Sequence, residues 1–202
     1  VSGINNTYKD VSTNGNSGVI AVSFFPLGAC NFFDFPLLEI ENSTINLEDI
    51  YNDTIKSIED RIGSASTLHQ RINIIEKYLL QKLNPVHCYD MMLIDEALSL
   101  INKSKGQVNA IGLSEKLSVS TKKLERRFST LIGKTPKQYI KIIRFQEVIK
   151  SFSYFKDKCF TELAYENGYF DQAHFIKDFK ELSGYTPKEF FSKYPCNTNQ
   201  YK

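Results

Sequence analysis

Apolar side chains recur every three or four residues through much of the first half of the chain, a spacing that predicts amphipathic helices. We expect these helices at about residues 46–62, 66–83 and 90–103. Asn46 is placed to cap the first helix. The Asn84-Pro85 pair ends the second, because proline disfavours helical geometry in the residue before it.

The apolar seam of the second helix has two interpretations. It consists of Leu68, Ile72, Ile75, Leu79 and Leu83, a repeat that resembles a short coiled-coil face. Such a face serves either dimerisation or packing on the chain's own helices. Because the repeat covers only about two and a half heptads, we favour packing within the chain.

Residues 18–36 have a different character, since they are rich in β-branched and aromatic side chains and are interrupted by Pro26, Gly28 and Pro36. This pattern predicts short strands and turns. One or two strands cannot bury both of their faces alone, so we expect the segment to be the remnant of a larger β-rich unit. The predicted fold is therefore mainly α, with a small β remnant before the helices.

An internal repeat occupies the second half of the chain. The first copy comprises Leu124, Phe128, Gly133, Thr135, Pro136, Lys137 and Tyr139, and the second, 51 positions later, comprises Phe175, Phe179, Gly184, Thr186, Pro187, Lys188 and Phe190. Upstream, Ser114–Ser120 corresponds to Ala164–Phe170 at a displacement of 50, so the second copy carries one extra residue beside Gly168. The same structural unit is therefore expected twice.

Each copy predicts a helix, a tight turn and a second amphipathic helix, at about residues 111–132 and 160–183. Ser120 and Asp171 are placed to cap the second helices. Gly133 and Gly184 end them, and a Thr-Pro pair then starts the following helix in each copy.

The second helix of each copy presents an apolar face and a polar face. At 100° per residue, Leu124, Phe128 and Leu131 face the core in the first copy, opposite Lys122, Arg126 and Ser129. In the second copy Phe175, Phe179 and Leu182 face inward, opposite Ala173, Lys177 and Lys180, with Gln172 and His174 on the shoulders.

Charge divides the chain at about the same place as the repeat. Residues 1–100 hold 6 Lys or Arg against 13 Asp or Glu, whereas residues 101–193 hold 18 against 10. A basic half beside an acidic half favours a polyanionic partner, because Lys and Arg release the counterions condensed on nucleic acid. The formal net charge of +2 conceals this division.

Other chemistry finds little support in the sequence. The cysteines Cys30, Cys88, Cys159 and Cys196 form no CxxC pair, which favours reduced thiols over disulfides or a zinc site. No apolar stretch reaches 18 residues, and no export signal opens the chain. The histidines His69, His87 and His174 belong to no catalytic motif. We expect a cytoplasmic protein that is not an enzyme and needs no metal or other cofactor.

Residues 107–193, and above all the string LAYENGYFDQAHFIKDFKELSGYTPKEFF at 163–191, resemble the DNA-binding domain of the bacterial AraC/XylS transcription regulators. LSVSTKKLERRF, residues 117–128, resembles the first-unit counterpart of that string. The resemblance implies two helix-turn-helix units joined by a long helix, and a regulator that binds double-stranded DNA. Residues 18–83 loosely resemble the end of a sensor-type region found in some members.

The resemblance also implies the residues that contact DNA. Base contacts are expected from Lys122, Glu125 and Arg126 in the first unit and from Gln172, Ala173, His174 and Lys177 in the second. Phosphate contacts are expected from Lys134, Lys137, Lys180 and Lys188. This chain departs from the family at Ile176, where many members carry a polar residue, and at Lys177, where arginine is common. Guanine recognition by the second unit is therefore in question.

The expected organisation is a partial regulatory region at residues 1–103, a DNA-binding domain at 104–193 that folds alone, and a tail at 194–202. Possible partners besides DNA are a small-molecule effector on the first region, RNA polymerase and a second copy of the chain. Two alternatives stay open. One is DNA-repair-type chemistry in a missing N-terminal part, with Cys30 as a conceivable nucleophile. The other is a sensor whose twin units bind only protein.

Overall fold

The computed structural model describes residues 1–8, 15, 18–51, 53–85, 89–152 and 159–194. Its described elements are helical, as the sequence predicted. In chain order they are the 3-10 helices η1 (Ala29–Asn31) and η2 (Leu37–Ile40), followed by α1 (Leu47–Tyr51), α2 (Asp53–Ser64), α3 (Leu68–Lys82), α4 (Tyr89–Lys103), α5 (Ala110–Lys116), α6 (Thr121–Ile132), α7 (Pro136–Phe152), α8 (Phe160–Glu166), α9 (Gln172–Ser183) and α10 (Pro187–Lys193).

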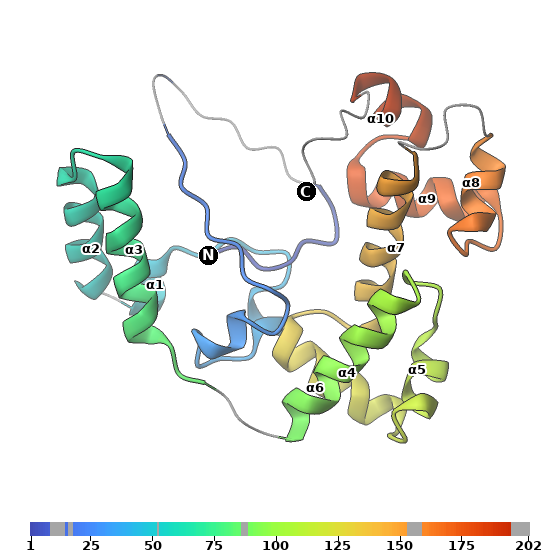
Figure 1. Cartoon of the computed structure of the whole chain (residues 1–202), viewed down its shortest axis with the longest axis horizontal. Helices are drawn as coiled ribbons and strands as arrows, with labels where there is room; N and C mark the ends of the chain where they lie inside the picture. Colours follow the sequence, from blue (N-terminus) through green and yellow to red (C-terminus); the bar gives the residue numbers. More distant parts are fainter. Residues whose placement is uncertain (9–14, 16–17, 52, 86–88, 153–158, 195–202) are drawn as a thin grey trace.

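The helices form two groups, with the N-terminal segment between them. Figure 1 shows α2 and α3 paired on one side of the molecule and α4–α10 on the other. The 3-10 helices η1 and η2 of this N-terminal segment, residues 1–46, pack on α6, and their apolar cluster includes Met91 near the start of α4. The N-terminal segment therefore contacts the helices of the internal repeat directly.

The strands expected in residues 18–36 are not formed, and this part of the prediction is wrong. Residues 18–25 form no helix or strand and pair with no strand among the described residues, and Val19 and Phe25 are largely exposed. The chain then turns at Gly28, whose N–H donates to the carbonyl of Phe25, and continues as η1. Without a neighbour to accept its backbone hydrogen bonds, an apolar segment of this kind cannot become a strand.

Pairing between strands among the described residues is limited to one antiparallel bridge, between Ser2 and Thr44. The backbone N–H of Ile45 donates to the carbonyl of Val1 at 2.8 Å, and the Ser2 and Thr44 hydroxyls are 2.9 Å apart. The bridge places the first residues of the chain beside Thr44 and Ile45, which follow η2.

The seam of α3 is only partly covered. Ile75 and Leu79 are half-buried and face α2 and the N-terminal segment, whereas Leu68 is 62% exposed and Leu83 is 42% exposed. The interpretation that we favoured, packing within the chain, therefore describes the middle of the seam and leaves its two ends uncovered.

Candidate nucleic-acid interface

The first unit consists of α5, a turn and α6. Asn109 caps α5, and the Ser120 hydroxyl accepts a hydrogen bond from the N–H of Lys123 at the start of α6. Gly133 ends α6 in the left-handed conformation, at a φ of 78°. Leu124 and Phe128 are fully buried. The cap at Ser120, the end at Gly133 and the two apolar positions are the ones that the repeat predicted, whereas the cap at Asn109 was not predicted.

The core of this unit extends to a helix that the repeat does not contain. Ile94, Ala97 and Ile101 of α4 are fully buried in the same cluster as Leu124 and Phe128. This cluster crosses the domain boundary that we expected near Ser104. We therefore propose that the DNA-binding domain begins at α4.

The second unit repeats the arrangement with α8, a turn and α9. Gly168 occupies the turn at a φ of 75°. The carboxylate of Asp171 caps α9 by accepting from the N–H of His174 at 2.7 Å. Phe175 and Phe179 are fully buried and pack edge to face, with ring centroids 5.7 Å apart. Gly184 ends α9, as Gly133 ends α6.

Polar contacts along α7 hold the two units together. Lys141 of α7 forms ion pairs with Asp178 at 3.0 Å and Glu181 at 2.8 Å, both on α9. Arg144, one turn further along α7, donates to the carbonyl of Gly106 at 2.8 Å and lies over the ring of Tyr169. These contacts join the linking helix to the loop before α5 and to the turn before α9, so they fix how the units are oriented.

The side chains expected to contact bases lie on two exposed helix faces. The structure leaves exposed Lys122, Glu125 and Arg126 on α6 and Gln172, Ala173, His174 and Lys177 on α9. Each set follows directly from the capped N-terminus of its helix. The two faces come from equivalent positions of the repeat.

In the second unit, Thr161 and Asp178 contact residues of the exposed face of α9. The sequence did not predict these two contacts. The Thr161 hydroxyl on α8 donates to the side-chain oxygen of Gln172 at 3.0 Å. Asp178, which is largely buried, lies 3.3 Å from Nε2 of His174. The four-residue spacing of His174 and Asp178 on one helix was the available signal for the second contact.

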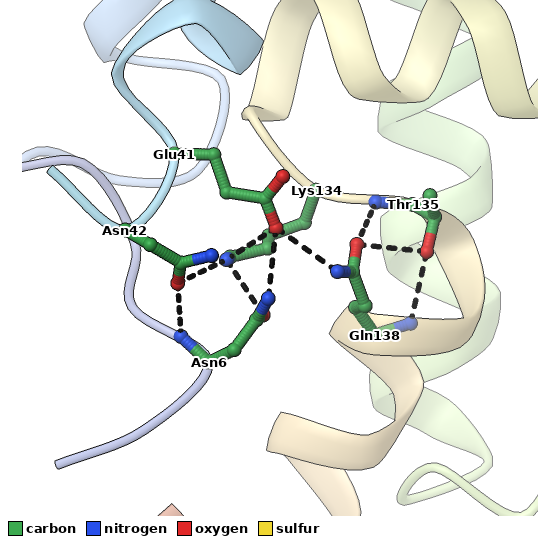
Figure 2. A network of polar contacts seen from close by, with 6 residues as sticks. All are labelled: Asn6, Glu41, Asn42, Lys134, Thr135 and Gln138. Atoms are coloured by element: carbon green, nitrogen blue, oxygen red, sulfur yellow. Dashed lines mark hydrogen bonds and ion pairs between the residues drawn. The ribbon is translucent and has the colours of Figure 1, made fainter.

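Among the expected phosphate contacts, Lys137, Lys180 and Lys188 are exposed. Lys134 is different, because its side chain is fully buried. Figure 2 shows its ammonium group inside a network of side chains from the N-terminal segment. Nζ of Lys134 lies 2.8 Å from Oε1 of Glu41, 2.6 Å from Oδ1 of Asn6 and 3.4 Å from Oδ1 of Asn42. In this structure Lys134 does not reach the surface, and its expected phosphate contact is corrected accordingly.

The network around Lys134 is closed on its other side by Gln138. Its side-chain N–H donates to Oε1 of Glu41 at 2.9 Å, while its oxygen accepts from the N–H of Thr135 (Figure 2). Hydrogen bonding from Lys134 holds the pKa of the Glu41 carboxyl below its ordinary value, and burial lowers the pKa of Lys134. The buried charge is therefore paired and hydrogen-bonded, as a buried ammonium group requires.

Ser129 also departs from the expected face. Helical geometry placed it beside Lys122 and Arg126 on the polar side of α6, yet it is only 8% exposed. The N-terminal segment packs on the end of α6, where a Cβ at Gly133 would lie 2.8 Å from the carbonyl oxygen of Leu37. The exposed polar face of α6 is thus confined to its first two turns.

No group of His, Cys, Asp and Glu side chains among the described residues has the arrangement of a metal site. Cys30 is buried and its thiol donates to the carbonyl of Leu27, and Cys159 is exposed, while Cys88 and Cys196 lie outside the described residues. No helix in the described ranges is long and apolar enough to cross a membrane.

Comparison with known proteins gives one match. Residues 113–193 match a family described as a helix-turn-helix domain, of the AraC type. The matched range includes most of α5 and the whole of α6–α10. No curated protein and no solved structure gives a significant match to the chain.

Proposed function

We propose that this chain, whose residues 113–193 match the AraC-type helix-turn-helix domain, is a DNA-binding transcription regulator of the AraC/XylS family that reads its operator with two recognition helices. In this proposal α6 and α9 enter successive major-groove segments on one side of the duplex. The observation that carries the proposal is the pair of capped helices with equivalent exposed faces, joined by α7.

The length of the linking helix supports this geometry. Helix α7 has 17 residues, which at 1.5 Å per residue is about 25 Å. With the adjoining turns it can separate two recognition helices by about 34 Å, one turn of B-DNA. The ion pairs of Lys141 with α9 keep that separation from varying freely.

The exposed residues suggest that the two half-sites are read with different stringency. Arg126 can donate two hydrogen bonds to O6 and N7 of guanine, and Gln172 can pair with N6 and N7 of adenine. The second face has Lys177 in place of a forked donor and carries the half-buried Ile176. We therefore propose that the first half-site is read more stringently than the second.

Phosphate contacts would come from Lys137, Lys180 and Lys188, which are exposed. The backbone N–H groups near the start of α7 and α10 would add to them. Lys134 is left out of this set, because its ammonium group donates hydrogen bonds to Glu41 and Asn6. On the order of 4 to 8 phosphate contacts would give a steep fall of affinity with salt.

Half-site footprinting tests the proposal. Arg126→Ala and Gln172→Ala are each expected to relax sequence preference in one half-site only, by about 1–3 kcal/mol. Arg61→Ala and Gln81→Ala, exposed residues of α2 and α3, are the matched controls and should change neither half. The two-helix proposal is wrong if both variants relax the same half, or if one chain protects only one groove segment.

A salt titration separates DNA binding from a purely protein-binding role. Fluorescence anisotropy with operator DNA should give a strongly negative slope of log affinity against log salt. A slope near zero, or no binding to bulk DNA at low salt, would favour a sensor whose twin units bind protein.

A further inference from the structure

The turns of the two helix-turn-helix units differ by one residue. In the first turn, the N–H of Val119 donates to a carbonyl of α5, and the cap Ser120 follows at once. In the second turn, the N–H of Tyr169 makes the equivalent bond to α8, but Phe170 stands between it and the cap Asp171. Phe170 is therefore the residue that the second copy of the repeat adds.

The ring of Phe170 takes no part in the core of the second unit. It is 86% exposed, whereas the preceding ring of Tyr169 is 3% exposed and packs on Phe175, with centroids 5.2 Å apart. The buried cluster of this unit includes Tyr169 and does not include Phe170. An exposed ring leaves a large apolar area in water, at a cost that contact with a partner would remove. The core of the unit therefore does not require a phenylalanine at this position.

Phe170 lies beside the face of α9 that is proposed to contact bases. Asp171 caps α9 by accepting from the N–H of His174, so Phe170 precedes the first helical residue, Gln172, by two positions. In helix-turn-helix complexes the residues at the start of the recognition helix are the ones that reach base edges. A ring at this position is therefore carried toward the duplex when α9 enters the major groove.

The exposed start of α9 carries a second apolar group. Ala173 is exposed and occupies the position that Lys122, also exposed, has on α6. The second unit thus presents a methyl group where the first unit presents an ammonium group. Because Phe170 and Ala173 stand on either side of the cap, the start of the second recognition helix is apolar at two exposed positions.

The major groove offers one apolar group for such side chains, the C5-methyl group of thymine, and Ala and Phe are among the residues that contact it. Gln172 suits the other base of an A·T pair, because its amide can pair with N6 and N7 of adenine. The Thr161 hydroxyl donates to the side-chain oxygen of Gln172 at 3.0 Å, which holds this amide at the start of α9. The apolar side chains and the amide therefore favour the same kind of base pair.

From this arrangement we propose that Phe170 packs on the C5-methyl group of a thymine in the second half-site, and that Ala173 extends the apolar surface it offers. The inference rests on the two-helix docking proposed above and names the sequence that its second helix selects. The second half-site then contains A·T pairs, recognised by the methyl group of thymine and by Gln172. The first half-site differs, because Arg126 there suits guanine.

Replacing thymine by deoxyuridine tests the proposal, because it removes the methyl group and leaves the hydrogen-bonding groups of the base in place. The probe is a duplex that the whole chain selects from a random DNA pool, and its second half-site is the one that Gln172→Ala relaxes. Each thymine of that half-site is replaced in turn, and affinity is measured by fluorescence anisotropy. We expect about fourfold weaker binding at one position, the factor that burial of one methyl group contributes.

Variants of Phe170 show which side chain reads the methyl group. Phe170→Ala should bind the thymine duplex at least fourfold more weakly than the parent chain does, and should bind the deoxyuridine duplex equally well. Phe170→Leu, which is still apolar, should keep part of the preference. Phe25→Ala is the matched control, because its ring is 88% exposed in the N-terminal segment, and it should change neither affinity. Circular dichroism melts of Phe170→Ala should match those of the parent chain, since the ring is exposed.

Footprints on the same duplexes separate this proposal from the one on which it rests. If both groove segments are protected but deoxyuridine is bound as tightly as thymine at every position, Phe170 reads no methyl group and the two-helix docking stands. A selected second half-site without thymine would also overturn the inference. So would a Phe170→Ala chain that keeps the affinity and the thymine preference of the parent, which would leave the ring for a protein partner. Protection of one groove segment per chain would overturn both proposals.

Discussion

In the first helix-turn-helix unit Leu124 and Phe128 pack against α4, a helix outside the repeat, whereas in the second unit Phe175 and Phe179 pack against Phe191 of α10. The core of the first unit is completed by a helix from earlier in the chain. The second is closed by aromatic rings, with Phe179 and Phe191 centroids 5.5 Å apart. The repeated positions thus meet equivalent rings, Tyr139 for Phe128 and Phe190 for Phe179, and differ in their further neighbours.

The glycines that end α6 and α9 have equivalent surroundings, but the residues that follow them do not. A Cβ at Gly133 would meet the backbone of Leu37, and a Cβ at Gly184 would meet the ring of Tyr8. Both neighbours belong to the N-terminal segment, which therefore contacts the two units at equivalent points. The following residues differ, since Lys134 is buried in the Glu41 network and Tyr185 accepts a hydrogen bond from Lys193.

The largest expected effect comes from removing α4, the helix that completes the core of the first unit. A fragment of residues 104–193 lacks the fully buried Ile94, Ala97 and Ile101, and each buried Ile contributes about 1.5–3 kcal/mol. That loss is comparable with the total stability of a small domain, about 5–15 kcal/mol. We expect residues 89–193 to melt cooperatively by circular dichroism, and the shorter fragment to lose protected amides in α5 and α6. Equal melting temperatures would show that α4 is dispensable.

Truncating the equivalent aromatic residues Phe128 and Phe179 tests whether the two cores lose the same unfolding free energy when a buried ring is removed. Phe128→Ala and Phe179→Ala each remove a fully buried ring, and each should lower the free energy of unfolding by about 3–5 kcal/mol in urea titrations. Phe170→Ala is the control, because this ring is 86% exposed, and its cost should be below about 0.5 kcal/mol. A much smaller cost at one of the two buried sites would mean that the unit concerned can repack.

The Glu41–Lys134 contact exists only in the first unit, and Glu41→Gln breaks it while keeping the shape of the side chain. Since Lys134 is fully buried, the loss of its counter-charge should cost about 2 kcal/mol of unfolding free energy. Glu39→Gln on the exposed side of η2 is the matched control. An unchanged stability would show that Lys134 leaves the network readily, which would restore it as a phosphate contact.

The same pair has a pH signature. The folded pKa of Glu41 lies below its ordinary value of 4.5, so its stabilising contribution is complete above that pH. It is lost as the pH falls through the lowered folded value. The difference in stability between the parent chain and Glu41→Gln should therefore shrink in urea titrations below about pH 4.

The smallest expected effect lies on the exposed face of the second unit. Thr161→Val removes the hydroxyl that donates to Gln172, and this should weaken base preference in the second half-site by about 0.5–1 kcal/mol. The first half-site in the same footprint is the internal control. If both halves change equally, Thr161 acts on the fold of the domain and not on Gln172.

Much of the repeat was predictable because its determinants are local. The caps Ser120 and Asp171, the helix-ending glycines and the spacing of Phe175 and Phe179 depend on neighbours within a few residues. The exposed faces of α6 and α9 follow from the same periodicity. The residues that bind DNA remain a prediction, carried by this exposure and by the family match.

The errors concern residues whose environment comes from distant parts of the chain. Residues 18–25 have the composition of a strand, yet a strand needs a partner that the sequence of the segment does not supply. Lys134 has the positive charge that a phosphate contact requires. Its position in the repeat gave no sign of its partner Glu41, which is 93 residues away.

The sequence by itself determined the two helix-turn-helix units, their caps and their polar faces, because helical periodicity and capping are properties of contiguous residues. Only the tertiary structure decided that α4 completes the first core, that Ser129 is buried, and that Lys134 is buried beside Glu41. The physical reason is that burial depends on what packs against a face, and here the packing elements lie far away along the chain.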